Sequence, residues 1–209
     1  MRKDIVAAWA SANGVAITDA QFAALAAYQE RVLEVNQHMN LTAITDPKDF
    51  AVKHIIDSLT LLSYLREGTS VIDIGTGAGF PGLVLRIMRD GIKLTLLDSL
   101  RKRIIFLRET SDMLGFSDVE CIHARAEEWK LSYDICTARA VASLDKLAKY
   151  ALPLVKKGGL FLAMKGYDVE GEIEKAKTSL KKFGGSVEKI VITEIEDGLR
   201  HSIVVIRKA

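Results

Sequence analysis

The sequence has few of the features that mark secreted, metal-binding and membrane proteins. Its two cysteines, Cys121 and Cys136, have neither the spacing of metal ligands nor the dense, even usage of a disulfide framework. We expect both to be small buried side chains in strands. No apolar run approaches the roughly 18 residues of a membrane span, and Met1-Arg-Lys-Asp4 lacks the apolar segment of a signal peptide. These absences predict a cytoplasmic protein with no metal site and no membrane partner.

The chain also has little net charge. A formal charge of +2 is too small to indicate a polyanionic partner by itself. Basic residues nevertheless form clusters, namely Arg101-Lys102-Arg103, Lys156-Lys157, Lys181-Lys182 and Arg207-Lys208. Most such clusters are solvated surface. The first cluster is an exception, because it follows Asp98, an acid at the end of a predicted strand.

The first third of the chain predicts helices. Thr18-Asp-Ala-Gln21 has the pattern of a capping box, and apolar residues at three- and four-residue spacing extend the helix to about Met39. Asp46-Pro47 starts a second helix with proline in its first turn. His54, Asp57 and Ser58 would share one face of that helix. We assign residues 1–66 to an N-terminal helical extension that packs on the core.

Residues 67–209 predict an α/β domain. Short apolar strands alternate with helix-length segments, at residues 71–74, 93–97, 119–123, 135–138 and 160–164. This alternation is typical of a parallel sheet with helices on both faces. A hairpin of residues 187–194 and 202–207, with its turn at 196–199, would add an antiparallel edge strand. The predicted fold is a Rossmann-like, mostly parallel, seven-stranded sheet, and 209 residues with 49% apolar content can bury one such core.

The most informative segment is the glycine-rich turn that follows the first strand. Asp73, Gly75, Gly77 and Gly79 form an acid-x-Gly-x-Gly-x-Gly pattern, which is typical of S-adenosylmethionine-dependent methyltransferases. Glycine lets the backbone take positive φ and lets a ligand approach closely, and the helix that follows presents free N–H groups.

A second register of the same turn indicates a different class of enzyme. Gly77, Gly79 and Gly82 fit the dinucleotide pattern Gly-x-Gly-x-x-Gly of an NAD-dependent oxidoreductase. If the first glycine must follow the strand directly, the register starts at Gly75, and Phe80 then stands where the third glycine belongs. This register favours the methyltransferase. The oxidoreductase and a purely structural turn remain alternatives.

Further candidates lie where the other predicted strands end, because ligands of open α/β sheets bind at the carboxyl ends of the strands. Asp98 follows the second strand and could accept hydrogen bonds from ribose hydroxyls. Ala126 and Glu127 follow the third, where an adenine would be held. Arg139 follows the fourth and could bind the methionine carboxylate, a substrate phosphate or the edge of a guanine, or form a structural salt bridge.

Two absent motifs narrow the methyl acceptor. The fourth strand lacks the Asn/Asp-Pro-Pro-aromatic motif of enzymes that methylate exocyclic amines, and Cys136 lacks the preceding proline common in cytosine carbon-5 enzymes. A guanine N(7) has a lone pair and no proton. Its methylation therefore requires alignment and desolvation and no general base.

The chain resembles a known family, the bacterial small-subunit ribosomal RNA (guanine-N(7))-methyltransferase G, also called glucose-inhibited division protein B. The similar segments occur in order along nearly the whole chain, at residues 40–45, 53–58, 73–82, 97–103, 124–128, 137–141 and 164–166. The resemblance implies S-adenosylmethionine as methyl donor and a guanine in the 530 loop of 16S rRNA as acceptor. It also implies 16S rRNA or the small ribosomal subunit as partner, and we expect a monomer.

The resemblance also implies roles for individual residues. Cofactor contacts would come from Gly75, Phe80, Ala126, Glu127 and Arg139, joined by Asp73, Gly77, Gly79 and Asp98 on the arguments above. RNA contacts would come from Asn40, His54, Lys165 and Arg200, with Arg101, Lys102 and Arg103. Arg139, His54 and Asn40 are the candidate catalytic residues, although His54 could equally be a structural partner of Asp57. A non-catalytic RNA-binding or division-associated protein that keeps this fold remains a third hypothesis.

Overall fold

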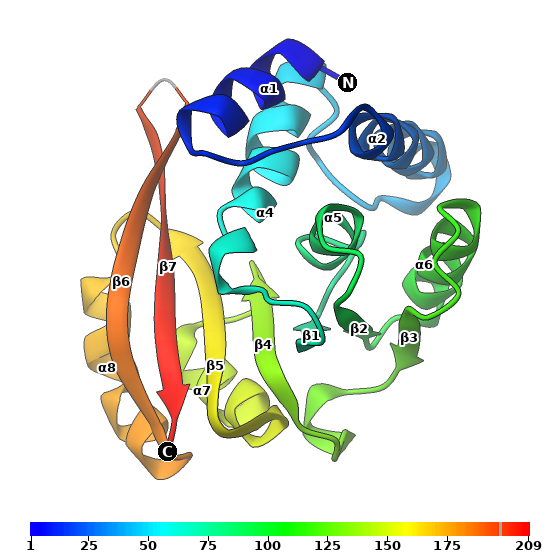
Figure 1. Ribbon diagram of the computed structural model, residues 1–209. Helices are drawn as coiled ribbons and strands as arrows, with labels where there is room; N and C mark the ends of the chain where they lie inside the picture. The colour runs from blue at the N-terminus through cyan, green and yellow to red at the C-terminus, as the bar shows by residue number, and fades with distance from the viewer. Residues whose placement is uncertain (197) are drawn as a thin grey trace.

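The fold is built on one seven-stranded sheet (Figure 1). The computed structural model describes residues 1–196 and 198–209, so Asp197 of the predicted turn lies outside the described residues. The strand order is β3-β2-β1-β4-β5-β7-β6. The strands are β1 (Ser70–Ile74), β2 (Lys93–Asp98), β3 (Glu120–His123), β4 (Tyr133–Arg139), β5 (Val155–Gly166), β6 (Gly185–Glu196) and β7 (Leu199–Lys208). Every predicted strand is present, with ends shifted by one to a few residues.

The sheet is mostly parallel, as predicted. β1 pairs in parallel with β2 and β4, and parallel pairs continue outward to β3 and β5. β7 runs antiparallel to both β5 and β6. The antiparallel strand therefore lies one position inside the edge, because the hairpin folds back so that its second strand, β7, pairs with β5.

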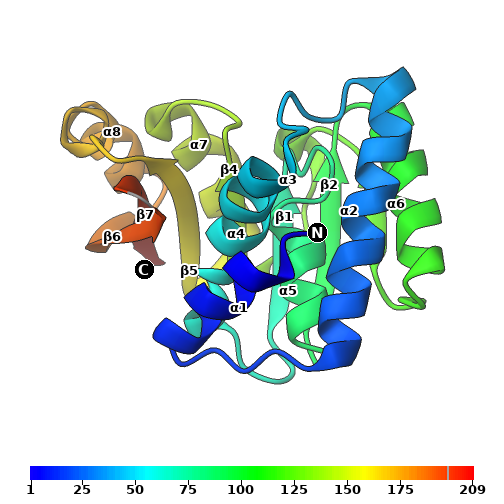
Figure 2. The same cartoon turned by 90° about the horizontal axis from the view of Figure 1, so that it is seen from above.

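Helices cover both faces of the sheet (Figure 2). On one face lie α7 (Leu144–Ala151) and α8 (Glu170–Lys182); on the other lie α5 (Gly82–Met88), α6 (Arg101–Met113) and the N-terminal helices. Right-handed crossovers explain this division, because the chain steps outward from β1 to β3 in one direction and from β4 to β5 in the other. Both cysteines are buried in strands, Cys121 in β3 and Cys136 in β4, which confirms the prediction.

The N-terminal extension shares its hydrophobic core with the sheet. α1 (Lys3–Ala12) has no counterpart in the sequence prediction, whereas α2 (Asp19–Met39) begins with the predicted capping box at Thr18. The Tyr28 hydroxyl of α2 is buried and donates to the carbonyl of Ala78 at 2.6 Å, next to the glycine-rich turn. Among the described helices, none is long and apolar enough to cross a membrane.

The helix predicted from Asp46-Pro47 is present but irregular. The Asp46 side chain accepts from the backbone N–H groups of Lys48 and Asp49 at the start of α3 (Pro47–Phe50). The chain then widens into a π-helix, η1 (Ala51–Ile56), before α4 (Asp57–Leu59) and a 3₁₀ turn, η2 (Leu62–Tyr64). Short π-helical turns are often found at functional sites, and this one faces the carboxyl end of the sheet.

Candidate active site at the carboxyl ends of the strands

A cavity of about 570 Å³ lies at the carboxyl ends of the central strands. Its walls come from the glycine-rich turn, from Arg139 and Ala140 at the end of β4, from the end of β5, and from the loop at Leu41–Ile44. The volume is in the range of small-molecule sites. Between β1 and β4 the strand order reverses, and this is where open α/β sheets bind ligands.

Backbone geometry explains the glycines of the turn. Gly75, Gly77 and Gly79 have φ values of 63°, 61° and 102°, a region that side chains with a Cβ rarely adopt. At Gly75 a Cβ would also lie 2.8 Å from a methyl group of Val141. Gly75 and Gly77 line the cavity, so their backbone forms part of its wall.

Asp73 lies behind the turn, and its side chain is fully buried. Its Oδ2 accepts hydrogen bonds from the Thr76 hydroxyl at 2.7 Å and from the Gly82 N–H at 3.0 Å. The residue was expected to contact the cofactor, but its bonds hold the two ends of the glycine-rich turn together. Burial raises the pKa of Asp73 to about 6, and the two hydrogen bonds only partly oppose this shift.

Asp98 ties the same turn to the end of β2. Its Oδ2 accepts from the Gly77 N–H at 3.0 Å, and its Oδ1 accepts from the Leu100 N–H at 2.9 Å. Arg103 also donates to Oδ2, at 3.3 Å, and lines the cavity, whereas Asp98 is only 2% exposed. A ligand hydroxyl that reaches Oδ2 of Asp98 would therefore compete with Arg103, whereas Oδ1 accepts only from the Leu100 N–H among the described contacts.

Ala126 and Glu127 lie beyond Asp98 along the carboxyl edge of the sheet. They form a 3₁₀ turn, η3 (Ala126–Glu128), that follows β3. The Ala124 N–H donates to the Asp98 carbonyl at 3.3 Å, which places this turn next to the end of β2. Ala126 and Glu127 lie outside the cavity wall described above. They are on the side where Asp98 would bind a ribose.

Arg139 joins the end of β4 to the N-terminal extension. Its Nη1 donates to the Lys53 carbonyl at 2.6 Å and to Asp57 Oδ2 at 3.0 Å. Its Nη2 donates to His54 Nδ1 at 3.0 Å. Asp57 is 2% exposed and accepts on its other oxygen from His201 Nδ1 at 2.8 Å. The guanidinium is therefore held in a fixed orientation at the cavity wall.

The π-helix supplies part of this site. In an α-helix the Asp57 N–H would donate to the carbonyl four residues earlier, that of Lys53. Here it donates to the carbonyls of Val52 and His54. The Lys53 carbonyl is released from that bond and accepts Arg139. The predicted α-helical pattern did not reveal this, because the widened turn is stabilised by a contact with a distant strand.

His54 is buried and neutral. Its ring stacks on Phe80, with centroids 4.3 Å apart and an interplanar angle of 13°. Burial, and then the charge of Arg139, lower its pKa to about 3. His54 Nε2 lies 2.8 Å from Thr42 Oγ1, so both ring nitrogens have partners. The sequence suggested His54 as a structural partner of Asp57. In the structure its ring nitrogens bond to Arg139 and Thr42.

The remaining candidate residues separate into two groups. Asn40 ends α2 in a left-handed conformation with φ of 51°, outside the cavity wall. Lys165 lines the cavity, but its ammonium donates to the Ala142 carbonyl at 2.6 Å and to Glu172 at 2.7 Å. Asn40 therefore ends a helix, and the Lys165 ammonium is held by other residues of the protein.

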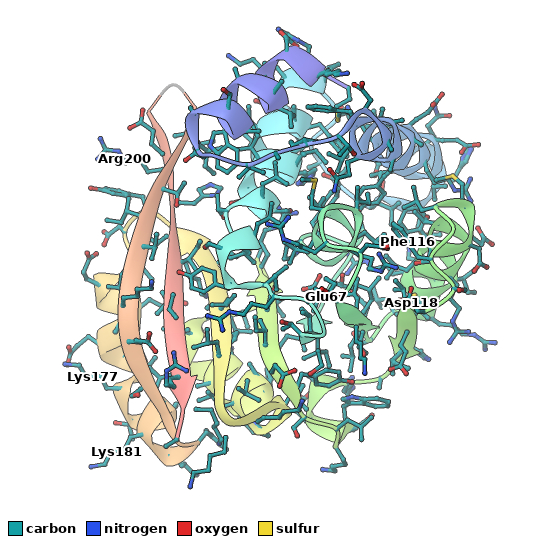
Figure 3. The ribbon with its side chains drawn as sticks, viewed as in Figure 1. Glu67, Phe116, Asp118, Lys177, Lys181 and Arg200 are labelled. Atoms are coloured by element: carbon teal, nitrogen blue, oxygen red, sulfur yellow. The ribbon has the colours of Figure 1, made fainter. Side chains whose placement is uncertain are left out.

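The other three cations are more exposed. Arg101 and Lys102 are exposed in the first turn of α6. Arg200 projects outward from β7, and its guanidinium lies 5.4 Å from the centre of the Tyr167 ring (Figure 3). These side chains are placed where they could contact a large ligand outside the cavity.

Sequence reasoning missed three residues of the site. Asp57 and Thr42 occur in segments that carry the family resemblance, but Asn40 was chosen in place of Thr42. His201 had no sequence signal, because it contacts Asp57 across 144 positions. Only the pairing of β7 with β5 brings it to the cavity.

Comparison with known proteins identifies the family. Residues 21–203 match the model of a family described as rRNA small subunit methyltransferase G. The chain belongs to this family. Its relatives include proteins named ribosomal RNA small subunit methyltransferase G from Alkaliphilus metalliredigens and Clostridium botulinum. The first is 45% identical over 93% of this chain and 85% of the relative, the second 43% identical over 91% and 83%.

Solved structures with the same fold include an AdoMet complex and a methyltransferase. M. jannaschii TYW2 in complex with AdoMet aligns with a TM-score of 0.60 and 16% identity, over 75% of this chain and 76% of that one. A precorrin-6y C5,15-methyltransferase from Geobacter metallireducens aligns with a TM-score of 0.57 and 16% identity, over 73% and 87%. At this level of identity the likeness establishes the Rossmann-like methyltransferase fold.

The raised pKa of Asp73 predicts a pH-dependent contribution to stability. An acid with a pKa of about 6 in the folded chain and 3.8 as its ordinary value keeps its proton longer when folded. Its contribution is full below about pH 4 and is lost as the pH rises through about 6. An Asp73→Asn variant has no such proton. The free energy of unfolding of Asp73→Asn minus that of the unsubstituted protein should therefore increase by up to about 3 kcal/mol between about pH 4 and pH 7.

Urea unfolding at a series of pH values would measure this difference. Asp134→Asn is a matched control, because Lys156 and Ser70 hold the pKa of Asp134 at about 2. Its difference from the unsubstituted protein should be flat over the same pH range. A flat difference for Asp73→Asn as well would show that Asp73 is ionised throughout.

Proposed function

We propose that the protein transfers a methyl group from S-adenosylmethionine to N(7) of a guanine in 16S rRNA, and that this guanine lies in the 530 loop. The observation that carries the proposal is the cavity beside Gly75 and Gly77, in a chain that belongs to the rRNA small subunit methyltransferase G family. The cofactor supplies an electrophilic methyl group on a sulfonium.

The residues present fit this cofactor. The glycine-rich turn leaves the backbone of Gly75 and Gly77 exposed at the cavity wall. Asp98 has acceptor capacity on Oδ1 for a ribose hydroxyl, since that oxygen accepts only the Leu100 N–H among the described contacts. Ala126 and Glu127 would hold the adenine. Phe80 and Arg139 would flank the methionine part of the cofactor. Asp73 would act by fixing the turn.

Among the described residues, the two titratable side chains bonded to Arg139 are not free to act as bases, which favours a nucleophile that carries no proton. His54 is neutral with both ring nitrogens bonded, and Asp57 is paired with Arg139 and His201. Burial raises the pKa of the Cys136 thiol well above its ordinary value, so it is no nucleophile. Guanine N(7) needs only alignment with the methyl group and exclusion of water. Fixed partners around Arg139 would provide that alignment.

The dinucleotide alternative fits less well. In its register a pyrophosphate would lie at the N-terminus of α5, but the Gly82 N–H there donates to the buried Asp73. If the register instead starts at Gly75, Phe80 stands where the third glycine belongs, and there it packs against Tyr28, Phe50 and His54. Saturable NAD binding without S-adenosylmethionine binding would support the oxidoreductase.

The proposed partner is 16S rRNA, alone or within the small ribosomal subunit, met by a monomeric enzyme in the cytoplasm. Arg101 and Lys102 are exposed next to Asp98, and Arg200 lies at the opposite side of the carboxyl edge. Such cations suit the RNA backbone. A splayed loop base is the form in which proteins usually read RNA sequence.

Methyl transfer to small ribosomal subunits that lack the modification tests the function. Label from S-adenosylmethionine should appear as 7-methylguanine, and chemical strand cleavage should map it to one guanine of the 530 loop. Cofactor binding without transfer would contradict the proposed acceptor. It would favour another substrate or a binding protein.

Arg139→Lys should lower the rate of methyl transfer by about 10- to 100-fold while the protein stays folded. A single ammonium keeps the charge next to Asp57 but cannot also serve His54 and the Lys53 carbonyl. Single-turnover rates, with circular dichroism as the folding check, would measure the effect. Arg108→Lys is the matched control, because Arg108 donates to the Cys121 carbonyl away from the cavity. Full activity of Arg139→Lys would refute the positioning role.

Arg103→Gln should bind S-adenosylmethionine about as tightly as the unsubstituted protein, because Arg103 donates to Oδ2 of Asp98 and leaves Oδ1 to the ribose. It should bind RNA more weakly, with the dependence of log affinity on log salt reduced by about one unit. Calorimetry and filter binding would measure the two affinities. In Arg101→Gln, the control, only RNA affinity should fall. A cofactor affinity that falls in Arg103→Gln would show that Arg103 supports the ribose site.

A further inference from the structure

A chain of hydrogen bonds leads from Arg139 to the loop that closes the cavity. Arg139 Nη2 lies 3.0 Å from His54 Nδ1, and His54 Nε2 lies 2.8 Å from Thr42 Oγ1. The Ile44 N–H also donates to Thr42 Oγ1, at 3.0 Å. Thr42 is partly exposed and lines the cavity. The order of donors and acceptors along this chain determines what Thr42 can bind.

Each bond in the chain has only one possible direction. A guanidinium can only donate, so His54 Nδ1 must accept. A neutral imidazole carries its one proton on the other nitrogen, so His54 Nε2 must donate to Thr42 Oγ1. The lowered pKa of His54, to about 3, agrees with a neutral ring.

The threonine hydroxyl is thereby left as a pure donor. Its two lone pairs accept from His54 Nε2 and the Ile44 N–H. Its own proton has no acceptor among the contacts of the described residues. A hydroxyl usually serves as donor or acceptor according to its ligand. Here both lone pairs of the Thr42 hydroxyl are occupied. At the cavity wall the hydroxyl can therefore only donate.

We propose that the Thr42 hydroxyl donates a hydrogen bond to an oxygen of the molecule in the cavity and thereby discriminates against ligands with a donor there. The inference rests on the proposed function, which offers two such oxygens. One is the carboxylate of S-adenosylmethionine, and the other is O6 of the target guanine. Adenine has an amine donor in place of O6, so a hydroxyl that cannot accept would reject adenine. Leaving a buried donor unpaired is costly, which makes this kind of selection effective.

Two substitutions separate the hydroxyl from its surroundings. Thr42→Val keeps the shape of the side chain and removes the hydroxyl, whereas Thr42→Ser keeps the hydroxyl and removes a methyl group. Thr42→Val also leaves the His54 Nε2 and Ile44 N–H groups without an acceptor. A comparison of ligands that have or lack the relevant oxygen is therefore needed, because a general disturbance would weaken both equally.

The first arm measures binding by calorimetry of S-adenosylmethionine and of decarboxylated S-adenosylmethionine. If the carboxylate is the acceptor, Thr42→Val should weaken S-adenosylmethionine binding about tenfold and leave the decarboxylated compound nearly unchanged. Thr42→Ser should bind both compounds as the unsubstituted protein does.

The second arm measures transfer to small subunits reconstituted with guanine or with 2-aminopurine, which lacks O6, at the target position. If O6 is the acceptor, Thr42→Val should bind the cofactor normally and methylate the guanine substrate about tenfold more slowly. Its rate on the 2-aminopurine substrate should match that of the unsubstituted protein. Thr42→Ser should behave as the unsubstituted protein on both.

The inference is overturned if Thr42→Val matches the unsubstituted protein in both arms. It is also overturned if Thr42→Val weakens ligands with and without the oxygen equally, or if Thr42→Ser is as impaired as Thr42→Val. Failure of the proposed function has a different signature. The unsubstituted protein would then bind S-adenosylmethionine but transfer no methyl group to guanine-containing subunits.

Discussion

The contact of Arg139 with the N-terminal extension is the interaction on which the rest of the site depends. One guanidinium at the end of β4 bonds to the Lys53 carbonyl, His54 and Asp57. These partners lie in and beside a π-helical turn, whose widened geometry releases the Lys53 carbonyl from the Asp57 N–H. A partly buried cation without these partners would be destabilising. The extension therefore forms part of the candidate active site and also covers one face of the sheet.

Two buried carboxylates, Asp73 and Asp98, hold the glycine-rich turn at the other side of the cavity. Asp73 bonds to Thr76 and Gly82 behind the glycine-rich turn and fixes its shape. Asp98 bonds to Gly77 from the end of the next strand and remains near the cavity surface beneath Arg103. The turn is thus held from two strands, while its backbone at Gly75 and Gly77 stays open to a ligand. Positive φ at the glycines makes this arrangement possible.

The hydrogen bonds of the site fix which atoms of His54 and Thr42 donate and which accept. Arg139 sets the tautomer of His54, and His54 sets the direction of the Thr42 hydroxyl. Asp57 is balanced by Arg139 and His201. A site built this way would orient a substrate and exclude water, and among the described residues neither His54 nor Asp57 is free to remove a proton. That chemistry matches a ring nitrogen that attacks with its own lone pair.

Local sequence determined the strands, the capping box at Thr18 and the glycine-rich turn, because alternating apolar residues, capping side chains and glycine act through neighbours in the chain. It also placed Asp98 and Arg139 correctly at strand ends. Only the tertiary structure decided that Asp73 lies behind the turn, that Lys165 is paired with Glu172, and that His201 reaches Asp57. It also decided that Thr42, and not Asn40, faces the cavity. The physical reason is that the direction of a polar side chain depends on partners from distant strands and helices, which no local pattern records.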